Sequence, residues 1–188
     1  NGKNGYCFTA NGGYYCKYGG NFNTWTTATK YTWAAWVKAS AAPRTPVISI
    51  LSNFDDNGGV RKAIIDPYIN AGNIYFWVCN HTGAEAAWQQ HNNKVPDTNW
   101  HFYAGSYNGD RLGSTMKVYV DGVLQVPTAY QDTMTWTGSL GTASLYTGRR
   151  YTTTYNSGSL VDEIMLWNRV LSQDEVTALY NSGNGLFY

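Results

Sequence analysis

The stretch GSLVDEIMLWNRVLS, residues 158–172, decides the fold of this chain of 188 residues. Its apolar run predicts a β-strand over residues 159–168, followed by a turn at Asn-Arg. Ser172 then stands as the N-cap of a helix, with Glu175 at the third helical position, which together form a capping box. The predicted helix is short, about two to three turns, because Gly183 follows soon afterwards.

Nearly all the rest of the chain predicts β-strands, separated by Gly, Asn, Asp and Pro. Strands at such short spacing are typical of a sandwich or jelly roll. The predicted strands cover residues 5–9, 13–18, 31–39, 47–52, 60–66, 73–79, 84–90, 100–107, 115–120, 143–148 and 159–168. No repeat, linker or shift of composition divides the chain. We therefore expect an all-β fold, a two-sheet antiparallel jelly-roll sandwich with one short C-terminal helix, as a single domain over residues 1–188.

The composition is poor in charge and rich in aromatic residues. Charged residues make up 13%, about half of the ~25% usual in soluble domains, whereas aromatic residues make up 16%, with 8 Trp, 16 Tyr and 6 Phe. The net charge of +1 offers no field for a phosphate backbone, and no apolar run approaches the ~20 residues of a spanning helix. The chain begins at Asn1 without an initiator Met, so we expect a processed chain or a module of a larger protein.

Two of the three cysteines flank a tight-hairpin signal. Asn11-Gly12 lies midway between Cys7 and Cys16, and with this pair at the tip of a hairpin the two cysteines stand opposite each other. Directly opposed residues are close enough for a disulfide, which indicates maturation in an oxidising compartment. The alternative is two reduced, buried thiols. Cys79, inside an apolar strand, is expected to be a small core residue.

Four segments, in chain order, resemble the laminin G-like (concanavalin A-like) jelly-roll family of lectins and glucanases. They are YTWAAWVK (31–38), NWHFYAGSYNG (99–109), MKVYVDGVLQ (116–125) and the opening stretch (158–172). The resemblance extends over nearly the whole chain and implies the jelly-roll fold. It does not imply one function, because this fold is used by lectins, adhesion modules, carbohydrate-binding modules, glycosidases, lyases and virion proteins.

The acidic residues do not match a glycosidase site. Glycoside hydrolysis needs two carboxylates that flank the scissile bond, and the glucanases of the family carry them in a Glu-x-Asp-x-x-Glu pattern. This chain has 12 acidic residues and no such run. Asp162 and Glu163 are adjacent, so on a regular strand they point to opposite faces, and Asp55-Asp56 beside Gly58 are expected to be solvated turn residues. We expect no catalytic residues and no enzyme activity.

The three histidines show no spacing suited to zinc. His101 lies in the Trp-His strand motif and is expected to be structural, and His81 and His91 are expected to lie in loops.

The family resemblance implies a structural calcium that joins the N-terminal hairpin to the last long strand. Asp162 matches the family's Asp-Glu position, and by the alternation of a strand it shares a face with Leu160, Ile164 and Leu166. A carboxylate there needs either a cation or backbone N–H groups. Asn11 and Asn21, with backbone carbonyls, are the expected further ligands of a Ca²⁺ ion.

The tryptophans divide into two groups. Those inside the family-like strands are assigned to the core: Trp33, Trp36, Trp100 and Trp167. Those in polar surroundings are expected to be exposed: Trp25, Trp88 and Trp136.

The predicted ligand site is an aromatic platform on the concave sheet. Trp88 and Gln90 lie on one predicted strand, and Tyr75 and Trp77 lie on its neighbour. Arg149 and Tyr151 are expected to flank the site at one rim. Flat aromatic faces suit the C–H surfaces of sugars, and amides suit sugar hydroxyls.

The sequence therefore predicts a non-catalytic carbohydrate-binding or adhesion module of an extracellular or surface protein. Its expected partner is a glycan or glycosylated surface, with no nucleic acid and no membrane insertion. The alternative is a structural domain of a virion, such as a decoration or fibre domain, that contacts neighbouring protein chains. A glycosidase or lyase is the third and weakest interpretation. The expected location is extracellular, at the cell surface or on a virion surface.

Overall fold

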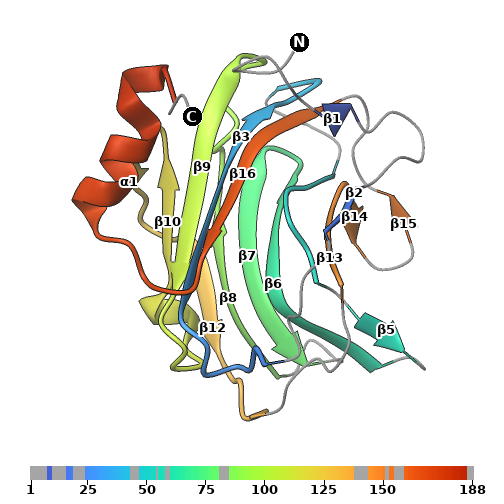
Figure 1. Cartoon of the computed structure of the whole chain (residues 1–188). Coiled ribbons are helices and arrows are strands. Elements are labelled where there is room, and N and C mark those ends of the chain that lie inside the picture. Colours follow the sequence, from blue (N-terminus) through green and yellow to red (C-terminus); the bar gives the residue numbers. More distant parts are fainter. Residues whose placement is uncertain are drawn as a thin grey trace.

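A computed structural model describes residues 8–9, 16–18, 24–42, 47–53, 55–57, 60–80, 85–137, 144–150, 153–154 and 159–185. Two antiparallel sheets face each other, and one helix lies outside them (Figure 1). The first sheet has the strand order β1-β16-β3-β9-β10-β11, and the second has the order β12-β8-β7-β6-β4, with β5 also paired to β6. Two further pairs, β13-β2 and β14-β15, lie on the side of the molecule opposite the helix (Figure 1).

The elements have the following bounds: β1 Phe8–Thr9, β2 Cys16–Tyr18, β3 Tyr31–Lys38, β4 Ile48–Ser49, β5 Asp55–Asn57, β6 Val60–Asn70, β7 Asn73–Asn80, β8 Glu85–His91, β9 Trp100–Tyr107, η1 Gly113–Thr115, β10 Lys117–Val120, β11 Val123–Leu124, β12 Ala129–Asp132, β13 Leu145–Thr147, β14 Arg149–Arg150, β15 Thr153–Thr154, β16 Leu160–Trp167, α1 Gln173–Tyr180 and η2 Asn181–Gly183. The antiparallel sandwich with one short C-terminal helix confirms the predicted fold class.

Strand β3 is apolar on both faces because it lies between two apolar clusters. Trp33 and Val37 face the core between the sheets, whereas Ala34 and Trp36 face α1. All residues of β3 from Tyr31 to Val37 are buried. A strand covered on both sides reads as a continuous apolar run rather than as an alternating one.

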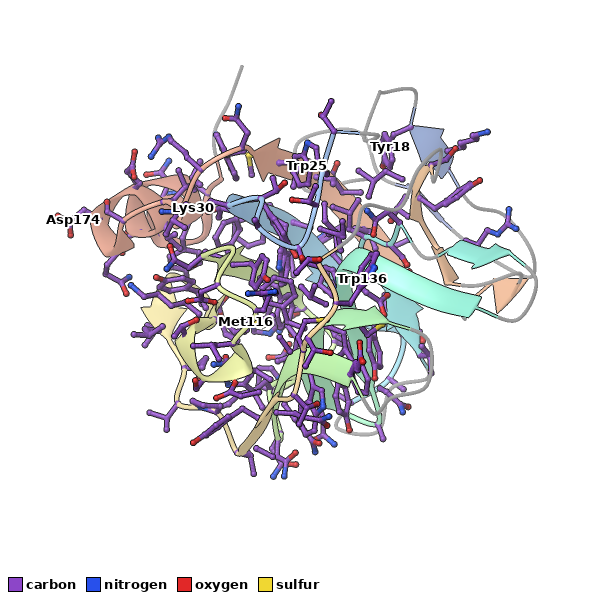
Figure 2. All side chains as sticks on the ribbon, turned by 90° about the horizontal axis from the view of Figure 1, so that it is seen from below. Tyr18, Trp25, Lys30, Met116, Trp136 and Asp174 are labelled. Carbon is purple, nitrogen blue, oxygen red and sulfur yellow. The ribbon has the colours of Figure 1, made fainter. Side chains whose placement is uncertain are left out.

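The core between the sheets is built from alternate residues of facing strands. Ile64, Ile69, Ile74, Phe76 and Val78 come from the second sheet, and Trp33, Val37, Tyr103, Val118 and Val161 come from the first. The rings of Trp33 and Phe76 meet edge to face with their centroids 5.6 Å apart. Met116 lies among these side chains, whereas Asp174 points outward from α1 (Figure 2).

Helix α1 covers the outer face of the first sheet. Ser172 accepts a hydrogen bond from the backbone N–H of Glu175, whose side chain accepts in turn from the N-cap backbone, so the predicted capping box is confirmed. Such a cap contributes about 1 kcal/mol to stability. Val176 and Leu179 pack with Trp36 in the second apolar cluster. None of the helices in the described residues is long and apolar enough to cross a membrane.

A β-bulge in β16 changes which residues share a face. Asp162 pairs with Trp36 and Met165 pairs with Ala34, so two residues of β16 stand against one residue of β3. Glu163 takes a positive φ of 47° at this point. Because the bulge shifts the alternation, Asp162 faces the same side as Met165, while Ile164 packs against the core between the sheets. The prediction that Asp162 shares a face with Ile164 and Leu166 is therefore wrong.

Several strand predictions need correction. Strand β1 pairs with β16 and β2 pairs with β13, and the expected N-terminal hairpin stays a prediction, because the cross-strand partners Cys7, Tyr14 and Tyr15 lie outside the described residues. Strand β6 continues past Pro67 to Asn70, because this proline follows a bulge and its carbonyl accepts the amides of Ile50 and Leu51. Asp55 and Asp56 lie in the short strand β5 rather than in a turn.

The tryptophan assignments are partly right. Trp33 and Trp36 are buried, but only Trp33 lies between the sheets, since Trp36 faces α1. Trp100 and Trp167 are half-buried beside Trp36. The prediction of exposure fails for Trp25, Trp88 and Trp136, because all three are half-buried. Trp25 and Trp136, labelled in Figure 2, pack against the core between the sheets, and Trp88 packs against a small buried group on the outward face of the second sheet.

Candidate functional site

The outward face of the second sheet carries two stacked aromatic pairs. Trp77 on β7 lies directly opposite Trp88 on β8, and their rings stack with centroids 5.5 Å apart and planes 11° apart. Tyr75, two residues before Trp77 and on the same face, stacks on Tyr68 of β6 with a centroid distance of 4.8 Å and an angle of 8°. We call these four residues the aromatic platform.

The platform faces outward because its residues alternate with core residues. Ile74, Phe76 and Val78 of β7 point into the core between the sheets, so Tyr75 and Trp77 between them point to the opposite face. Tyr75, Trp77 and Trp88 are half-buried, and Tyr68 is buried with 8% exposure.

Small residues lie beside the tryptophan pair and let it pack down on the sheet. Ala63, Cys79 and Ala86 follow one another across β6, β7 and β8 and are all buried. Trp77 and Trp88 pack against this group. The buried Cys79 thus lies under the outward face rather than between the sheets, although it is a small packing residue as expected.

Amide side chains border the platform. Gln90 lies directly opposite Tyr75, and its Nε2 donates to Asn92 Oδ1 at 2.7 Å. Gln131 on β12 lies opposite Trp88 and accepts the indole N–H of that ring at 2.7 Å. The edges of both stacks therefore meet amide groups, which can donate to or accept from sugar hydroxyls.

The structure thus brings together four of the six residues predicted for the ligand site: Tyr75, Trp77, Trp88 and Gln90. Arg149 lies on β14, outside the second sheet, and its guanidinium is 4.9 Å from the centroid of the Tyr146 ring. Its carbonyl accepts the hydroxyl of Ser49, which pairs with Tyr68, so Arg149 lies beyond the tyrosine end of the platform. Tyr151 lies outside the described residues.

Sequence reasoning missed two residues of this face. Tyr68 follows Pro67, where the predicted strand had already ended. Gln131 belongs to β12, a strand that was not predicted because Ala129–Asp132 lacks an apolar alternation. The alternation of Tyr68 with Ile69 could have revealed the first of them.

Asp66 lies opposite Trp77 on the same face and is fully buried. A bulge between Ala63 and Asp66 sets this register. It lets Ile64 and Ile65 both point into the core.

Asp162, the predicted calcium ligand, is buried with 8% exposure. Its Oδ1 accepts the backbone N–H of Glu163 at 2.9 Å, so a backbone group contacts the carboxylate as the alternative interpretation expected. Strand β1 pairs with Leu160 and Val161, which brings the N-terminal segment beside Asp162. Asn11 and Asn21 lie outside the described residues, and a calcium ion shared with them stays a proposal.

Cys16 is a free, half-buried thiol in β2, and burial raises its pKa. Cys7 lies outside the described residues. A disulfide between the two therefore stays a prediction about the oxidised chain.

The histidines have unequal surroundings. His91 ends β8 and is fully buried, not in a loop as expected. Its ring contacts Gln89 Oε1 and Val126 O at 3.0 and 3.2 Å, and burial lowers its pKa to about 4. His101 lies in β9, as expected, and His81 is not described. Within the described part of the chain, no three His, Cys, Asp or Glu side chains gather as potential metal ligands.

Comparison with solved structures gives the same fold in toxin binding domains. The receptor-binding domain of botulinum neurotoxin D is 12% identical, with a TM-score of 0.59 over 90% of this chain and 41% of the other. The binding domain of botulinum neurotoxin DC in complex with SialylT is 12% identical, with a TM-score of 0.56 over 82% of this chain and 36% of the other. The same domain in complex with rat synaptotagmin II is 13% identical, with a TM-score of 0.57 over 82% and 36%.

This chain spans about two fifths of the length of those domains. The search of curated proteins gave no match. The profile of one protein family, described as the concanavalin A-like lectin/glucanases superfamily, matches residues 9–177. With nearly the whole chain covered, and with the sandwich and helix that its motifs predict, the protein belongs to the concanavalin A-like lectin/glucanase superfamily.

Proposed function

We propose that this protein is a non-catalytic carbohydrate-binding or adhesion module that binds glycan on the aromatic platform. The observation that carries the proposal is the meeting of Tyr68, Tyr75, Trp77 and Trp88 on one outward face. Packing between the sheets does not explain these aromatic rings, because the core between the sheets is filled by the residues that alternate with them, such as Ile74, Phe76 and Val78 of β7.

The platform suits a neutral, hydroxylated ligand. Within each stacked pair one ring covers a face of the other. The ligand therefore meets the exposed parts of the half-buried Tyr75, Trp77 and Trp88, while the buried Tyr68 supports Tyr75 from one side. Gln90 and Gln131 lie beside these rings and supply amide groups. A sugar with an apolar C–H face and polar hydroxyl rim has the matching chemistry.

The comparisons support a binding role in general terms. The similar binding domain of botulinum neurotoxin DC forms complexes with SialylT and with rat synaptotagmin II. We propose an extracellular or surface location, a place within a larger protein, and a structural Ca²⁺ held by Asp162, Asn11 and Asn21. In that role Asp162 would supply a carboxylate oxygen and the ion would tie the N-terminal segment to β16.

A protein partner is the second candidate, as in a virion or assembly domain. Exposed apolar side chains gather in one segment at the edges of both sheets, where β11 and β12 lie: Val123 is 63% exposed, Leu124 47%, Val126 84% and Tyr130 56%. An exposed apolar edge of this kind suits contact with a neighbouring chain.

A glycan array separates the two candidates. We expect the wild-type chain to bind a defined set of glycans, tested with calcium and with EDTA. Binding to no glycan under either condition, combined with self-association that Val126→Lys abolishes, would favour the assembly role. Release of sugar from a polysaccharide would contradict both.

A further inference from the structure

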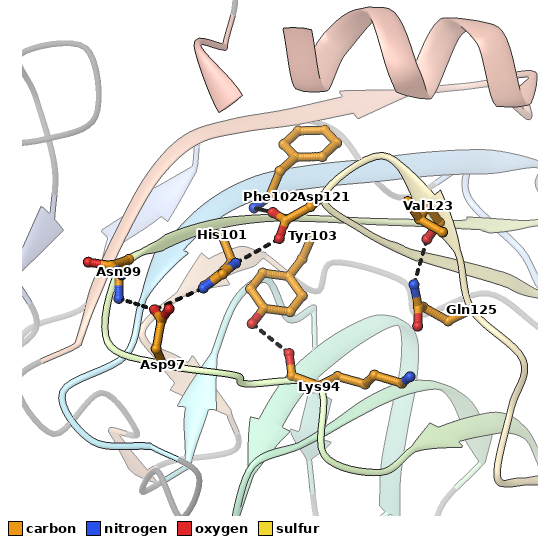
Figure 3. A network of polar contacts seen from close by, with 9 residues as sticks. All are labelled: Lys94, Asp97, Asn99, His101, Phe102, Tyr103, Asp121, Val123 and Gln125. Atoms are coloured by element: carbon orange, nitrogen blue, oxygen red, sulfur yellow. Dashed lines mark hydrogen bonds and ion pairs between the residues drawn. The ribbon is translucent and has the colours of Figure 1, made fainter. Parts of the chain in front are cut away.

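One histidine of this structure lies between two carboxylates. His101 Nδ1 is 2.7 Å from Asp121 Oδ2, and His101 Nε2 is 3.0 Å from Asp97 Oδ1 (Figure 3). The side chain of His101 is 14% exposed. This arrangement is separate from the aromatic platform, since it lies at the beginning of β9 in the other sheet.

Both ring nitrogens must donate for both contacts to be favourable. Ionised carboxylates only accept hydrogen bonds, and a neutral imidazole has one N–H. In the neutral form one of the two contacts would therefore set a nitrogen lone pair against a carboxylate oxygen. The geometry fits the doubly protonated imidazolium of His101.

The two carboxylates are themselves held by backbone groups. Asp121 Oδ1 accepts the N–H of Phe102 at 2.9 Å, and Asp97 Oδ1 accepts the N–H of Asn99 at 2.6 Å (Figure 3). Tyr103 donates to the carbonyl of Lys94 at 2.9 Å and so fixes the start of the same loop. Neither acid is free to turn away from His101 without losing a backbone hydrogen bond.

Each carboxylate belongs to a segment that contacts another part of the molecule. Asp121 and Gly122 form the turn between β10 and β11, both with positive φ. The carbonyl of Gly122 accepts the side-chain amide of Gln173 on α1 at 2.7 Å. Thr98 and Asn99, next to Asp97, line a pocket at this end of the sheet together with Lys38, Ala39, Ser40 and Leu160.

We propose that His101 is a pH-sensitive latch: its imidazolium joins the loop around Asp97 to the turn at Asp121, and loss of its proton releases the loop that lines this pocket. Hydrogen bonds to Asp121 and then Asp97 raise the pKa of His101 above its usual value. Hydrogen bonds from Asn99 and His101 lower the pKa of Asp97.

The charged groups around the ring come from every neighbouring element. Asp97 and Asp121 are the charged groups that act on His101. Lys38 at the end of β3 shares the pocket with Asn99. Burial, with Asp121 and Asp97 nearby, raises the pKa of Tyr103 of β9, and burial, with Asp121 nearby, raises the pKa of Tyr180 of α1.

The sign of the pH dependence follows from these directions. A group whose pKa is raised in the folded chain stabilises it fully below the unfolded value, about 6.5 for histidine. This stabilisation is lost as the pH rises through the folded pKa. The latch is therefore closed in mildly acidic solution and opens in alkaline solution.

The experiment combines a titration by NMR with thermal unfolding. The imidazole of His101 is assigned by comparison with His101→Gln and titrated in the wild type, in Asp97→Asn and in the control Asp174→Asn, which removes an exposed carboxylate of α1. We expect a midpoint above about 6.5 in the wild type and the control, and a lower midpoint in Asp97→Asn. The protection factor of the Asn99 amide, which corrects its exchange rate for the intrinsic base-catalysed rise with pH, should fall through the same pH range.

Thermal unfolding gives the second readout. We expect the wild-type Tm to fall by about 3–5 °C per unit by which the pKa is raised, as the pH passes through the His101 midpoint. His101→Gln should lack this fall. Equal His101 titration midpoints in the wild type and in Asp97→Asn would contradict the proposed latch, even if His101→Gln does not fold. A protection factor of the Asn99 amide that does not change through the His101 titration would contradict it as well.

Discussion

Trp77 and Trp88 lie opposite each other on β7 and β8, and their indole rings stack 5.5 Å apart on the outward face of the sheet. Cross-strand pairs of this type are the unit by which a sheet gains stability from its exposed face. The pair is therefore both a structural contact and the centre of the proposed ligand surface, and these two roles can be separated by measurement.

The stacking should appear as a coupling energy between the two tryptophans. We expect Trp77→Ala and Trp88→Ala each to lower the free energy of unfolding. The double variant should lose about 0.5–1.5 kcal/mol less than the sum, which is the usual energy of an aromatic pair beyond its burial. Chemical denaturation measures all four proteins, and strict additivity would show that the rings do not interact.

Gly105 is required because the ring of Trp33 lies directly on it. A Cβ at this position would stand 2.7 Å from the indole Cε2, closer than side chains tolerate. We expect Gly105→Ala to destabilise the chain by about 1–3 kcal/mol through overpacking, measured by denaturant unfolding. An unchanged midpoint would mean that Trp33 moves aside without cost.

The cysteine prediction is tested by mass spectrometry of the oxidised chain. With a Cys7–Cys16 bridge, alkylation of the unfolded chain without reductant should modify one of the three cysteines. The cysteine modified in this experiment should be Cys79. After reduction all three should react. Modification of three thiols without reductant would exclude the bridge.

The calcium proposal predicts a chelator effect that depends on Asp162. At a free calcium concentration 100 times the Kd, EDTA should lower the Tm by roughly 5–10 °C. Asp162→Asn should unfold at the lower temperature with or without EDTA. Equal Tm values of the wild type with calcium and with EDTA would contradict the calcium proposal.

The fold was readable from the sequence where local signals agree. The capped helix after Ser172 and the doubly apolar strand at Tyr31–Lys38 were found because capping and burial leave patterns in neighbouring residues. The bulge at Glu163 left no such pattern. A single extra residue in β16 reverses the alternation, and so the face of Asp162 was assigned wrongly.

The candidate site was readable where its residues lie on predicted strands. Tyr75, Trp77, Trp88 and Gln90 meet because β7 and β8 form a hairpin in the register that alternation requires. Gln131 could not be found in this way, since it comes to Trp88 on a polar edge strand. Long-range pairing of that kind depends on the whole sandwich and not on local sequence.

The most direct test of the proposed function compares three proteins on the glycans that the array identifies. These are the wild type, Trp88→Ala in the platform, and Tyr130→Ala as the control. Tyr130 is an exposed aromatic residue of β12 that lies outside the platform, because it pairs with the buried Gln89 and not with Trp88. Calorimetric titration should show binding by the wild type and Tyr130→Ala, and a loss of at least about tenfold, or 1.4 kcal/mol, in Trp88→Ala. Equal affinities for all three folded proteins would contradict a binding role for the platform.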